Sequence, residues 1–414
     1  MTLPNGNWSE SNLLCKTLNI DYPIIQAGMA GITTPELVSA VSNEGGLGVL
    51  GASKLSPEQL LDSIRKIRKN TSRPYGVNLI LAPPENPEPN AQSTYQEIQL
   101  FLDNKLRRPM GLPPKIKTEM SDSHLGIKEA GHDDSPLHKS LHLPPLPSPI
   151  FEDQLKIILE EKVPVVSFAM GNLRTLIDKV HSNGSKVMSM VTSVEEAVEV
   201  SSNGSDVIIA QGSEAGGHRS TFNIRKWPNG VPLVGTMTLV SQIVDALRNT
   251  KETNKTNDTI MPIVAAGGIG DGRGLVAAMA LGASGVAIGT RFIVCRESAA
   301  FHSYKERLLS SKETDTIVTN VFSGRPARAV RNKLTEEYLN STIKPLSWPY
   351  QGMISEDIYA NAIATDNADY YPLLAGQGLR MLKRNQGAGE IVREIITEAK
   401  ESLALMEKTL NQAS

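Results

Sequence analysis

Eight short apolar segments recur along the chain, and segments with a helical spacing of apolar residues separate them. The apolar segments run from residue 24 to residue 290 and read IIQAG, LGVLG, YGVNLIL, VPVVSFAM, KVMSMV, DVIIAQG, PIVAAGG and GVAIGT. They lack the polar-apolar alternation of half-exposed strands, which favours parallel strands covered on both faces. Because eight parallel strands close a (β/α)8 barrel, the sequence predicts an α/β protein of the TIM-barrel type.

The rest of the chain supplies the helices and two additions to this barrel. Helices are predicted over 34–43, 56–70, 151–161, 173–182, 193–202 and 236–249. Residues 82–150 contain dense proline clusters without a sustained helical period, so we expect an insertion after the third strand that is partly disordered or lid-like. The predicted organisation is a barrel over 17–312, interrupted by 82–150, and a mainly helical extension over 313–414 that caps it.

Composition limits the partners and the compartment. Lys and Arg total 42 and Asp and Glu total 44, which leaves a net charge of -2. No overall field attracts nucleic acid or an acidic membrane, so small molecules are the expected partners. Cys15 and Cys295 lie far apart in the sequence, which argues against a disulfide framework or a zinc site. Without an apolar run of about 20 residues or a leader, the chain is expected to be cytoplasmic. Its oligomeric state stays open.

Glycine-rich turns follow the seventh and eighth predicted strands. Gly267 and Gly268 end one strand, and Gly289 and Thr290 end the next. Glycines let backbone N–H groups approach an anion, and the helix predicted after the first turn adds the partial positive charge of its N-terminus. Neighbouring strand ends of a barrel can hold one phosphate between them. The turns lack the dinucleotide and P-loop spacings, so a mononucleotide such as a flavin phosphate fits better.

Polar and small residues occupy other predicted strand ends, where barrels carry their chemistry. Ala27, Gly28 and Met29 follow the first strand, Asn78 interrupts the apolar third strand, and the sixth strand ends in QGSEAGGHRS from Gln211 to Ser220. Asn78 could equally be a satisfied core amide. His218 follows Gly216 and Gly217, and an imidazole there can act as a base near neutral pH. Glu214 and Asp271 are isolated and are predicted to be a loop contact and a helix N-cap. No metal site is expected.

The segments QGSEAGGHRS and AAGGIGDGRGLVAAMALGASGVAIGTRF resemble the nitronate monooxygenase family, formerly called 2-nitropropane dioxygenases, which are FMN-containing barrels. The resemblance covers about residues 20–82 and 151–295. It implies that His218 is the catalytic base and that FMN contacts are made by Ala27, Gly28, Met29, Asn78, Gln211, Gly216, Gly217, Gly267, Gly268, Gly289 and Thr290, with Gly376 and Gln377 closing over the flavin. The implied reaction is oxidation of an alkyl nitronate by dioxygen, or of a nitroalkane after His218 removes a proton, to a carbonyl compound and nitrite.

The chain departs from the family pattern at several places, and other functions remain open. The first turn reads AGMAG where the family commonly has APMAG, Met170 stands where an aromatic residue is frequent, and Ser220 replaces a frequent glycine. A second hypothesis is an NAD(P)H-dependent flavin reductase of the enoyl-acyl-carrier or quinone reductase type, in which His218 orients the substrate. A third is a noncatalytic flavoprotein whose insertion binds a partner. Nucleotide dehydrogenases need a nucleophilic cysteine, whereas Cys295 is predicted to be packed.

Overall fold

Eight parallel strands form a closed barrel in the computed structural model, which describes residues 8–81, 91–116, 150–227, 230–253 and 261–413. Around the barrel the order is β1-β2-β3-β4-β5-β6-β8-β9. The strands are β1 (Ile24–Gln26), β2 (Leu47–Gly51), β3 (Tyr75–Ile80), β4 (Val165–Ala169), β5 (Lys186–Val191), β6 (Val207–Gln211), β8 (Ile263–Ala266) and β9 (Gly285–Ile288). Each strand lies inside one of the eight apolar segments, so the prediction of a TIM barrel is confirmed.

Helices cover the outside of the barrel, as the apolar spacing predicts. They are α3 (Pro35–Asn43), α4 (Pro57–Asn70), α6 (Phe151–Glu160), α7 (Arg174–Ser182), α8 (Val194–Ser202), α9 (Thr236–Thr253) and α10 (Gly272–Ala280). Side chains of Thr34, Ser56, Ser193 and Asp271 cap α3, α4, α8 and α10 by accepting first-turn N–H bonds, which is why these helices begin where they do. Among the described residues, no helix is both long enough and apolar enough to cross a bilayer.

The N-terminal segment closes one end of the barrel. Helices α1 (Trp8–Ser11) and α2 (Leu13–Leu18) contribute Trp8, Leu14 and Leu18 to a cluster with residues of the barrel strands. The side chain of Leu14 lies directly against the start of β9, where a Cβ on Gly285 would be 2.5 Å from it. The strands begin at this end, so the C-terminal ends of the strands, where barrels carry their sites, lie at the opposite end.

A second layer of structure lies beyond these C-terminal strand ends. It contains a three-stranded antiparallel sheet of β10 (Thr316–Thr319), β11 (Ala327–Val330) and β7 (Gly217–His218), with Ala327 opposite His218. Helices α12 (His302–Ser310), α13 (Lys333–Leu339), α14 (Tyr350–Ile354) and α15 (Glu356–Ala364) surround it. The extension is mainly helical, as predicted, but it also contains two strands that were not predicted. Strand β10 pairs with β11, and β11 also pairs with β7, more than one hundred residues earlier in the chain.

The insertion also contains regular structure, which corrects the expectation of no helix within residues 82–150. Helix α5 (Ala91–Leu102) continues into a π-helical turn, η1 (Asp103–Arg107), and a short 3-10 helix, η2 (Arg108–Met110). Tyr95, Ile98, Leu102 and Leu106 are buried at helical spacing, a period that the surrounding prolines obscure in the sequence. Residues 82–90 and 117–149 lie outside the described residues, so the prediction of a disordered or lid-like segment there is untested.

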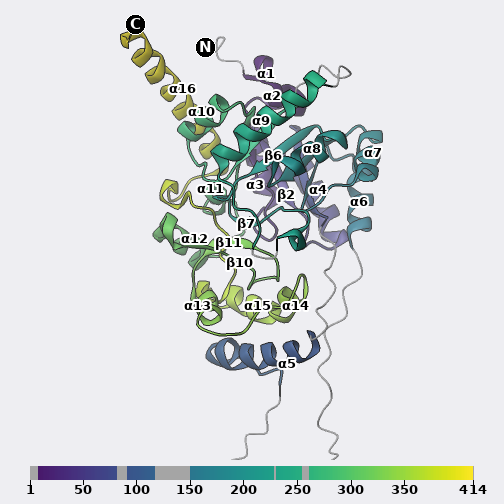
Figure 1. Ribbon diagram of the computed structural model, residues 1–414, viewed down its shortest axis with the longest axis vertical. Coiled ribbons are helices and arrows are strands. Elements are labelled where there is room, and N and C mark those ends of the chain that lie inside the picture. The colour runs from purple at the N-terminus through teal and green to yellow at the C-terminus, as the bar shows by residue number, and fades with distance from the viewer. Residues whose placement is uncertain (1–7, 82–90, 117–149, 228–229, 254–260, 414) are drawn as a thin grey trace, which may run out of the picture.

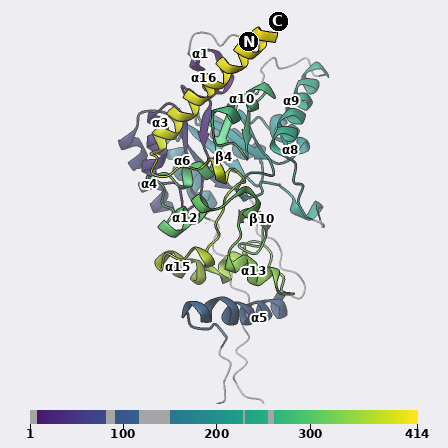
Figure 2. The same ribbon diagram turned by 90° about the vertical axis from the view of Figure 1, so that its left-hand side faces the viewer.

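Helix α5 packs against the extension and not against the barrel. The rings of Phe101 and Tyr338 lie 4.7 Å apart in an edge-to-face arrangement. The guanidinium of Arg107 is fully buried and binds Asp103 at 2.9 Å and Asp357 at 2.8 Å. Figures 1 and 2 show the resulting order of layers, with the small sheet between the barrel and α13–α15 and with α5 on the far side of these helices.

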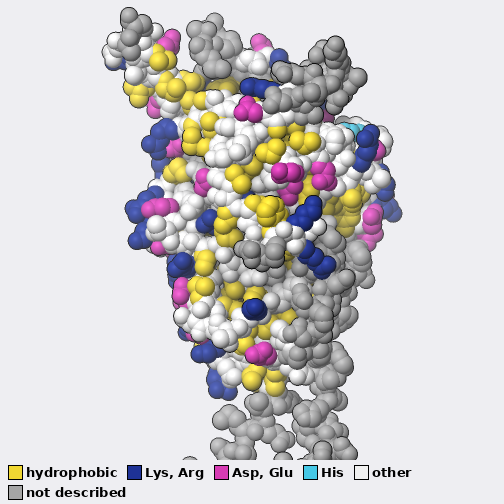
Figure 3. All heavy atoms as spheres, in the orientation of Figure 1, with side chains coloured by type: hydrophobic (Ala, Val, Ile, Leu, Met, Phe, Trp, Pro, Cys, Tyr) yellow, Lys and Arg dark blue, Asp and Glu magenta, His cyan; other side chains and the backbone are white. Residues whose placement is uncertain are grey.

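The last helix, α16 (Ala388–Ala413), returns to the barrel and packs on α10 and α3. Its end extends past the barrel in both ribbon views (Figures 1 and 2), and Leu405, Met406 and Leu410 are exposed there. Figure 3 shows charged side chains of both signs interspersed over the visible face, in keeping with a net charge near zero. The division into a barrel over 17–312 and an extension over 313–414 stays a prediction.

Candidate functional site at the barrel mouth

Residues at the ends of β1, β3 and β9 touch one another at the mouth of the barrel. A Cβ on Gly28 would lie 2.8 Å from the Cβ of Asn78, so the turn after β1 packs directly on β3. On the other side, a Cβ on Gly289 would lie 3.6 Å from the sulfur of Met29 and 3.8 Å from the Cβ of Ala27. The predicted residues Ala27 to Met29 thus connect Asn78 to the turn after β9.

The segment around Gly376 and Gln377 lies across the same mouth. The N–H of Gly376 donates to the hydroxyl of Thr290 at 2.9 Å, and the N–H of Gln377 donates to the carbonyl of Glu214 at 2.9 Å. A Cβ on Gly216 would overlap the backbone of Ala375 and Gly376, so only glycine permits this close approach. Although Gly376 and Gln377 are far from the barrel in sequence, the structure joins them to the strand ends of β6 and β9.

The glycine turn after β8 leaves its donors available. Gly267 and Gly268 adopt φ angles of 117° and 70°, which favour glycine. Within the described residues, the N–H groups of residues 267–270 donate no hydrogen bond to the protein. The carbonyl of Gly267 points elsewhere, because it accepts the hydroxyl of Thr236 at 3.0 Å. A turn of free N–H groups beside Thr290 suits an external anion.

The helix after this turn contributes less than the sequence suggested. The N–H of Gly272 donates to the carboxylate of Glu398 at 2.9 Å, and the N–H of Gly274 donates to the carboxylate of Asp271 at 2.9 Å. Two carboxylates therefore already neutralise the N-terminus of α10, contrary to the expectation that its positive charge serves an anion. Glu398 comes from α16, so no local pattern around residue 271 reveals this contact.

The amide of Gln211 holds the backbone that carries His218. Its Nε2 donates to the carbonyl of His218 at 2.9 Å, and its Oε1 accepts the N–H of Ser220 at 2.9 Å. The Asn78 amide is also partly engaged, since its Nδ2 donates to the hydroxyl of Ser167 at 3.2 Å. Gln211 thus has a positioning role that the sequence analysis did not assign, in addition to its predicted place at the mouth.

His218 stands where the barrel meets the small sheet. Its Nε2 lies 2.7 Å from the hydroxyl of Ser323. Its ring lies edge-to-face with the indole of Trp348, with 5.7 Å between centroids and an interplanar angle of 76°. The preceding Gly217 has a φ of 78°, and a Cβ there would meet nothing within 4 Å, so the space beside Gly217 itself is open.

The surroundings keep His218 uncharged. Burial is the main cause that lowers the pKa of its imidazole from 6.5 to about 4, and the positive charges of Arg325 and Lys54 lower it further. A neutral imidazole has a free lone pair at ordinary pH and can accept a proton. With Ser323 holding one ring nitrogen, the other is left without a protein partner among the described residues.

Buried arginines support the loop that bears His218. The guanidinium of Arg219 donates to the carbonyls of Gly212 at 2.6 Å and Gln211 at 2.9 Å. Arg325 binds the carbonyl of Thr221, and Arg328 donates to the carbonyl of Ser213 at 2.8 Å. Rigid guanidinium forks of this kind fix the conformation of the loop.

Four of these functional side chains were not predicted from the sequence. Ser323, Arg325 and Trp348 come from the extension, where no motif marks them. Lys54 follows the end of β2, and the rule that barrel chemistry collects at strand ends would have found it.

The remaining reactive groups have structural roles, as the sequence predicts. The carboxylate of Glu214 accepts the backbone N–H of Thr236 at 2.9 Å, which makes it a loop contact, and Asp271 caps α10. Cys295 is fully buried, and burial raises the pKa of its thiol to about 12. A thiol that stays protonated is a poor nucleophile, so the packed role predicted for Cys295 is confirmed.

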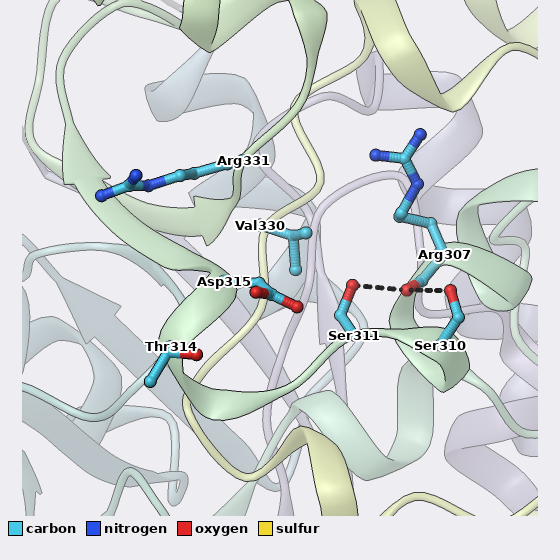
Figure 4. Close-up of a pocket in the computed structure, with 7 residues that line it drawn as sticks. All are labelled: Arg307, Ser310, Ser311, Thr314, Asp315, Val330 and Arg331. Carbon is cyan, nitrogen blue, oxygen red and sulfur yellow. Dashed lines mark hydrogen bonds between the residues drawn. The ribbon is translucent and has the colours of Figure 1, made fainter.

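Two surface hollows elsewhere are poor candidates for the site. One, of about 330 Å³, lies between α12, the turn before β10 and the end of β11 (Figure 4), and a second, of about 550 Å³, lies beside it along α12. Figure 4 shows the hydroxyls of Ser310 and Ser311 turned to the carbonyl of Arg307, while the guanidinium groups of Arg307 and Arg331 extend away from each other. Neither hollow contains a residue of the mouth.

The mouth fits a flavin phosphate in its donors and in its space. Free turn N–H groups and the Thr290 hydroxyl are suitable ligands for a phosphate. A Cβ on Gly289 would make only ordinary contacts at 3.6 Å or more, and a Cβ on Gly217 would make none within 4 Å, so these glycines leave room that a side chain would fill. A planar ring can therefore approach the backbone next to His218.

The chain is similar to known proteins over nearly its whole length. A family model described as nitronate monooxygenase matches residues 11–398. A probable nitronate monooxygenase of Staphylococcus saprophyticus is 36% identical over 387 residues, which cover 93% of this chain and 96% of the relative. A solved nitroalkane oxidase from Streptomyces ansochromogenes has a TM-score of 0.76 and 29% identity, and covers 95% of this chain and 99% of its own. FabK from Thermotoga maritima has a TM-score of 0.67 and 28% identity, covering 96% and 99%.

Proposed function

The chain belongs to the nitronate monooxygenase family, and on that premise we propose that it binds FMN and oxidises alkyl nitronates with dioxygen. Nitroalkanes are substrates after His218 removes a proton, and the products are a carbonyl compound and nitrite. The small-molecule substrate and dioxygen are its partners in this proposal. The observation that carries it is the placement of His218, which is held by Ser323 at the same mouth as the glycine turns with free donors.

The residues of the mouth divide the work of holding the cofactor. Gly267, Gly268, Gly289 and Thr290 would bind the phosphate, while Ala27, Gly28, Met29, Asn78, Gln211, Gly216, Gly217, Gly376 and Gln377 would surround the ring system. When bound, FMN supplies the redox chemistry of the reaction. The protein supplies position and polarity through the donors of the mouth.

The proton transfer is assigned to His218 and its neighbours. In the tautomer in which Nε2–H donates to the hydroxyl of Ser323, 2.7 Å away, Nδ1 has the lone pair that accepts the proton on the carbon next to the nitro group. Loss of that proton leaves a nitronate anion. The positive charges of Arg325 and Lys54 act on His218. They would stabilise the nitronate anion and the transition state that leads to it, since fixed charges are most effective where charge develops.

Purified protein is expected to be yellow and to release FMN, not FAD, on denaturation. The turns after β8 and β9 offer one cluster of free donors, which suits a single phosphate. Chromatography of the released flavin against FMN and FAD standards checks this result. A colourless protein that takes up neither flavin on reconstitution would count against the whole proposal. Release of FAD would count against the claim that the cofactor is a mononucleotide.

The rate with neutral nitroalkane is expected to be nearly independent of pH between pH 5 and pH 8. Because burial, Arg325 and Lys54 lower the pKa of His218 to about 4, about nine-tenths of the imidazole is still unprotonated at pH 5. A histidine with the reference pKa would lose activity about thirtyfold at pH 5. A profile of kcat/KM for nitroethane distinguishes the two, and a fall centred near pH 6.5 would contradict the neutral-base account.

A further inference from the structure

Trp348 is the largest side chain in contact with the proposed base. Its indole lies edge-to-face with the imidazole of His218, with 5.7 Å between ring centroids, and it is only partly buried. A substrate carbon that gives its proton to His218 must come within hydrogen-bonding reach of the imidazole. The groups attached to that carbon therefore lie near the indole, which belongs to the loop before α14.

The backbone of this loop is fixed from two sides. On one side, a Cβ on Gly324 would overlap the backbone of Leu346 to Trp348, and Gly324 itself has a φ of 88°. The loop therefore packs directly on the segment that contains Ser323. On the other side, the buried amide of Gln351 accepts the N–H of Leu346 at 3.0 Å and donates to the hydroxyl of Tyr338 at 2.7 Å. Trp348 is thus presented to His218 by a rigid frame.

The environment of His218 has an apolar part and a cationic part. Trp348 contributes an aromatic surface, whereas Arg325 and Lys54 contribute positive charge that acts on the imidazole. An alkyl nitronate has the complementary parts, which are an anionic nitro group and an apolar alkyl group. Charge favours the nitro group on the side of the cations and leaves the alkyl group to the indole.

We propose that Trp348 is the wall of the substrate pocket that limits the size of the alkyl group accepted beside His218. This inference rests on the proposed function, because it identifies which nitronates the same site takes. A rigid wall discriminates by volume, and one methylene group in a hydrophobic pocket is typically worth tenfold or more in kcat/KM. Trp348 is a specificity-determining residue in this account, and it takes no part in the proton transfer.

Trp348→Ala is expected to shift the preference of the enzyme toward longer nitronates. With the linear series from ethylnitronate to hexylnitronate, the ratio of kcat/KM for hexyl over ethyl should rise by about tenfold relative to the unaltered protein. Trp348→Phe, which keeps a smaller ring, should fall between the two. An equal change for all members of the series would overturn the proposal, because a merely structural loss acts on every substrate alike.

A binding measurement decides the point without turnover. Hexanoate, a planar anion with an alkyl chain, should alter the tryptophan fluorescence of the flavin-loaded protein. The response should persist in Trp227→Phe, which removes an indole that is 44% exposed outside the mouth, and should disappear in Trp348→Phe. If hexanoate still changed the tryptophan fluorescence of Trp348→Phe, the proposal that Trp348 lines the substrate pocket would be overturned. If the protein oxidised no nitronate, the proposed function would fail while this titration still decided the position of Trp348.

Discussion

His218→Asn is expected to lower kcat/KM for neutral nitroethane by about 10² to 10⁴, the usual contribution of a positioned general base. Asparagine keeps a polar side chain but lacks a basic nitrogen, so it cannot accept the proton. Preformed ethylnitronate has already lost that proton, so much of its oxidation should survive. Steady-state rates with both substrates, measured on protein with equal flavin content, give the comparison.

The control for this substitution is His302→Asn, which alters an exposed histidine at the start of α12. It should leave the rates with both substrates unchanged. Equal losses on nitroethane and ethylnitronate in His218→Asn would contradict a role as base and would point to a role in binding. Since Gln211 and Arg219 hold the loop through backbone carbonyls, the substitution should not disturb the loop itself.

Gly289→Ala is expected to weaken FMN binding by about 10- to 100-fold while leaving the fold intact. The added methyl group would meet Met29 at 3.6 Å and Ala27 at 3.8 Å, both ordinary contacts, and the φ of -108° suits alanine. The same methyl group would occupy space that the phosphate needs. Loss of one charge-assisted hydrogen bond is typically worth about 1.5–3 kcal/mol, which corresponds to the stated range.

Titration of the apoprotein with FMN, followed by quenching of flavin fluorescence, measures this effect. Gly352→Ala in α14 is the matched control, since its methyl group would also meet nothing closer than 3.7 Å and lies outside the proposed cofactor residues. It should bind FMN normally. If Gly289→Ala bound FMN as tightly as the unaltered protein, the turn after β9 would not belong to the cofactor site. A large fall in the melting temperature of the variant would show that position 289 has no room for a methyl group.

The barrel could be predicted because its signal is local. Each strand is a short apolar run, and each helix has its own period and cap, so neighbouring residues suffice to define both. The missed helix α5 had the same kind of signal in Tyr95, Ile98 and Leu102, but prolines on both sides concealed it. The strands β7, β10 and β11 had no such signal. Strands β10 and β11 are only four residues long and pair with each other, and the two residues of β7 form a strand only through their distant partner β11.

The candidate site was predictable to the same extent. The glycine turns and His218 could be found because they lie within contiguous motifs at strand ends. The contacts that surround His218 could not be predicted, because Ser323 lies 105 residues from His218 in the chain and Trp348 lies farther still. Glu398 likewise neutralises the start of α10 from the last helix, which no pattern in residues 267–274 indicates.

The most direct test of the account mixes the flavin-loaded protein anaerobically with ethylnitronate and, separately, with NADH, while the flavin absorbance is followed. We expect ethylnitronate to bleach the flavin band and admission of dioxygen to restore it with release of nitrite. Bleaching by NADH, with no response to ethylnitronate, would contradict the account and would favour a flavin reductase in which His218 orients the substrate.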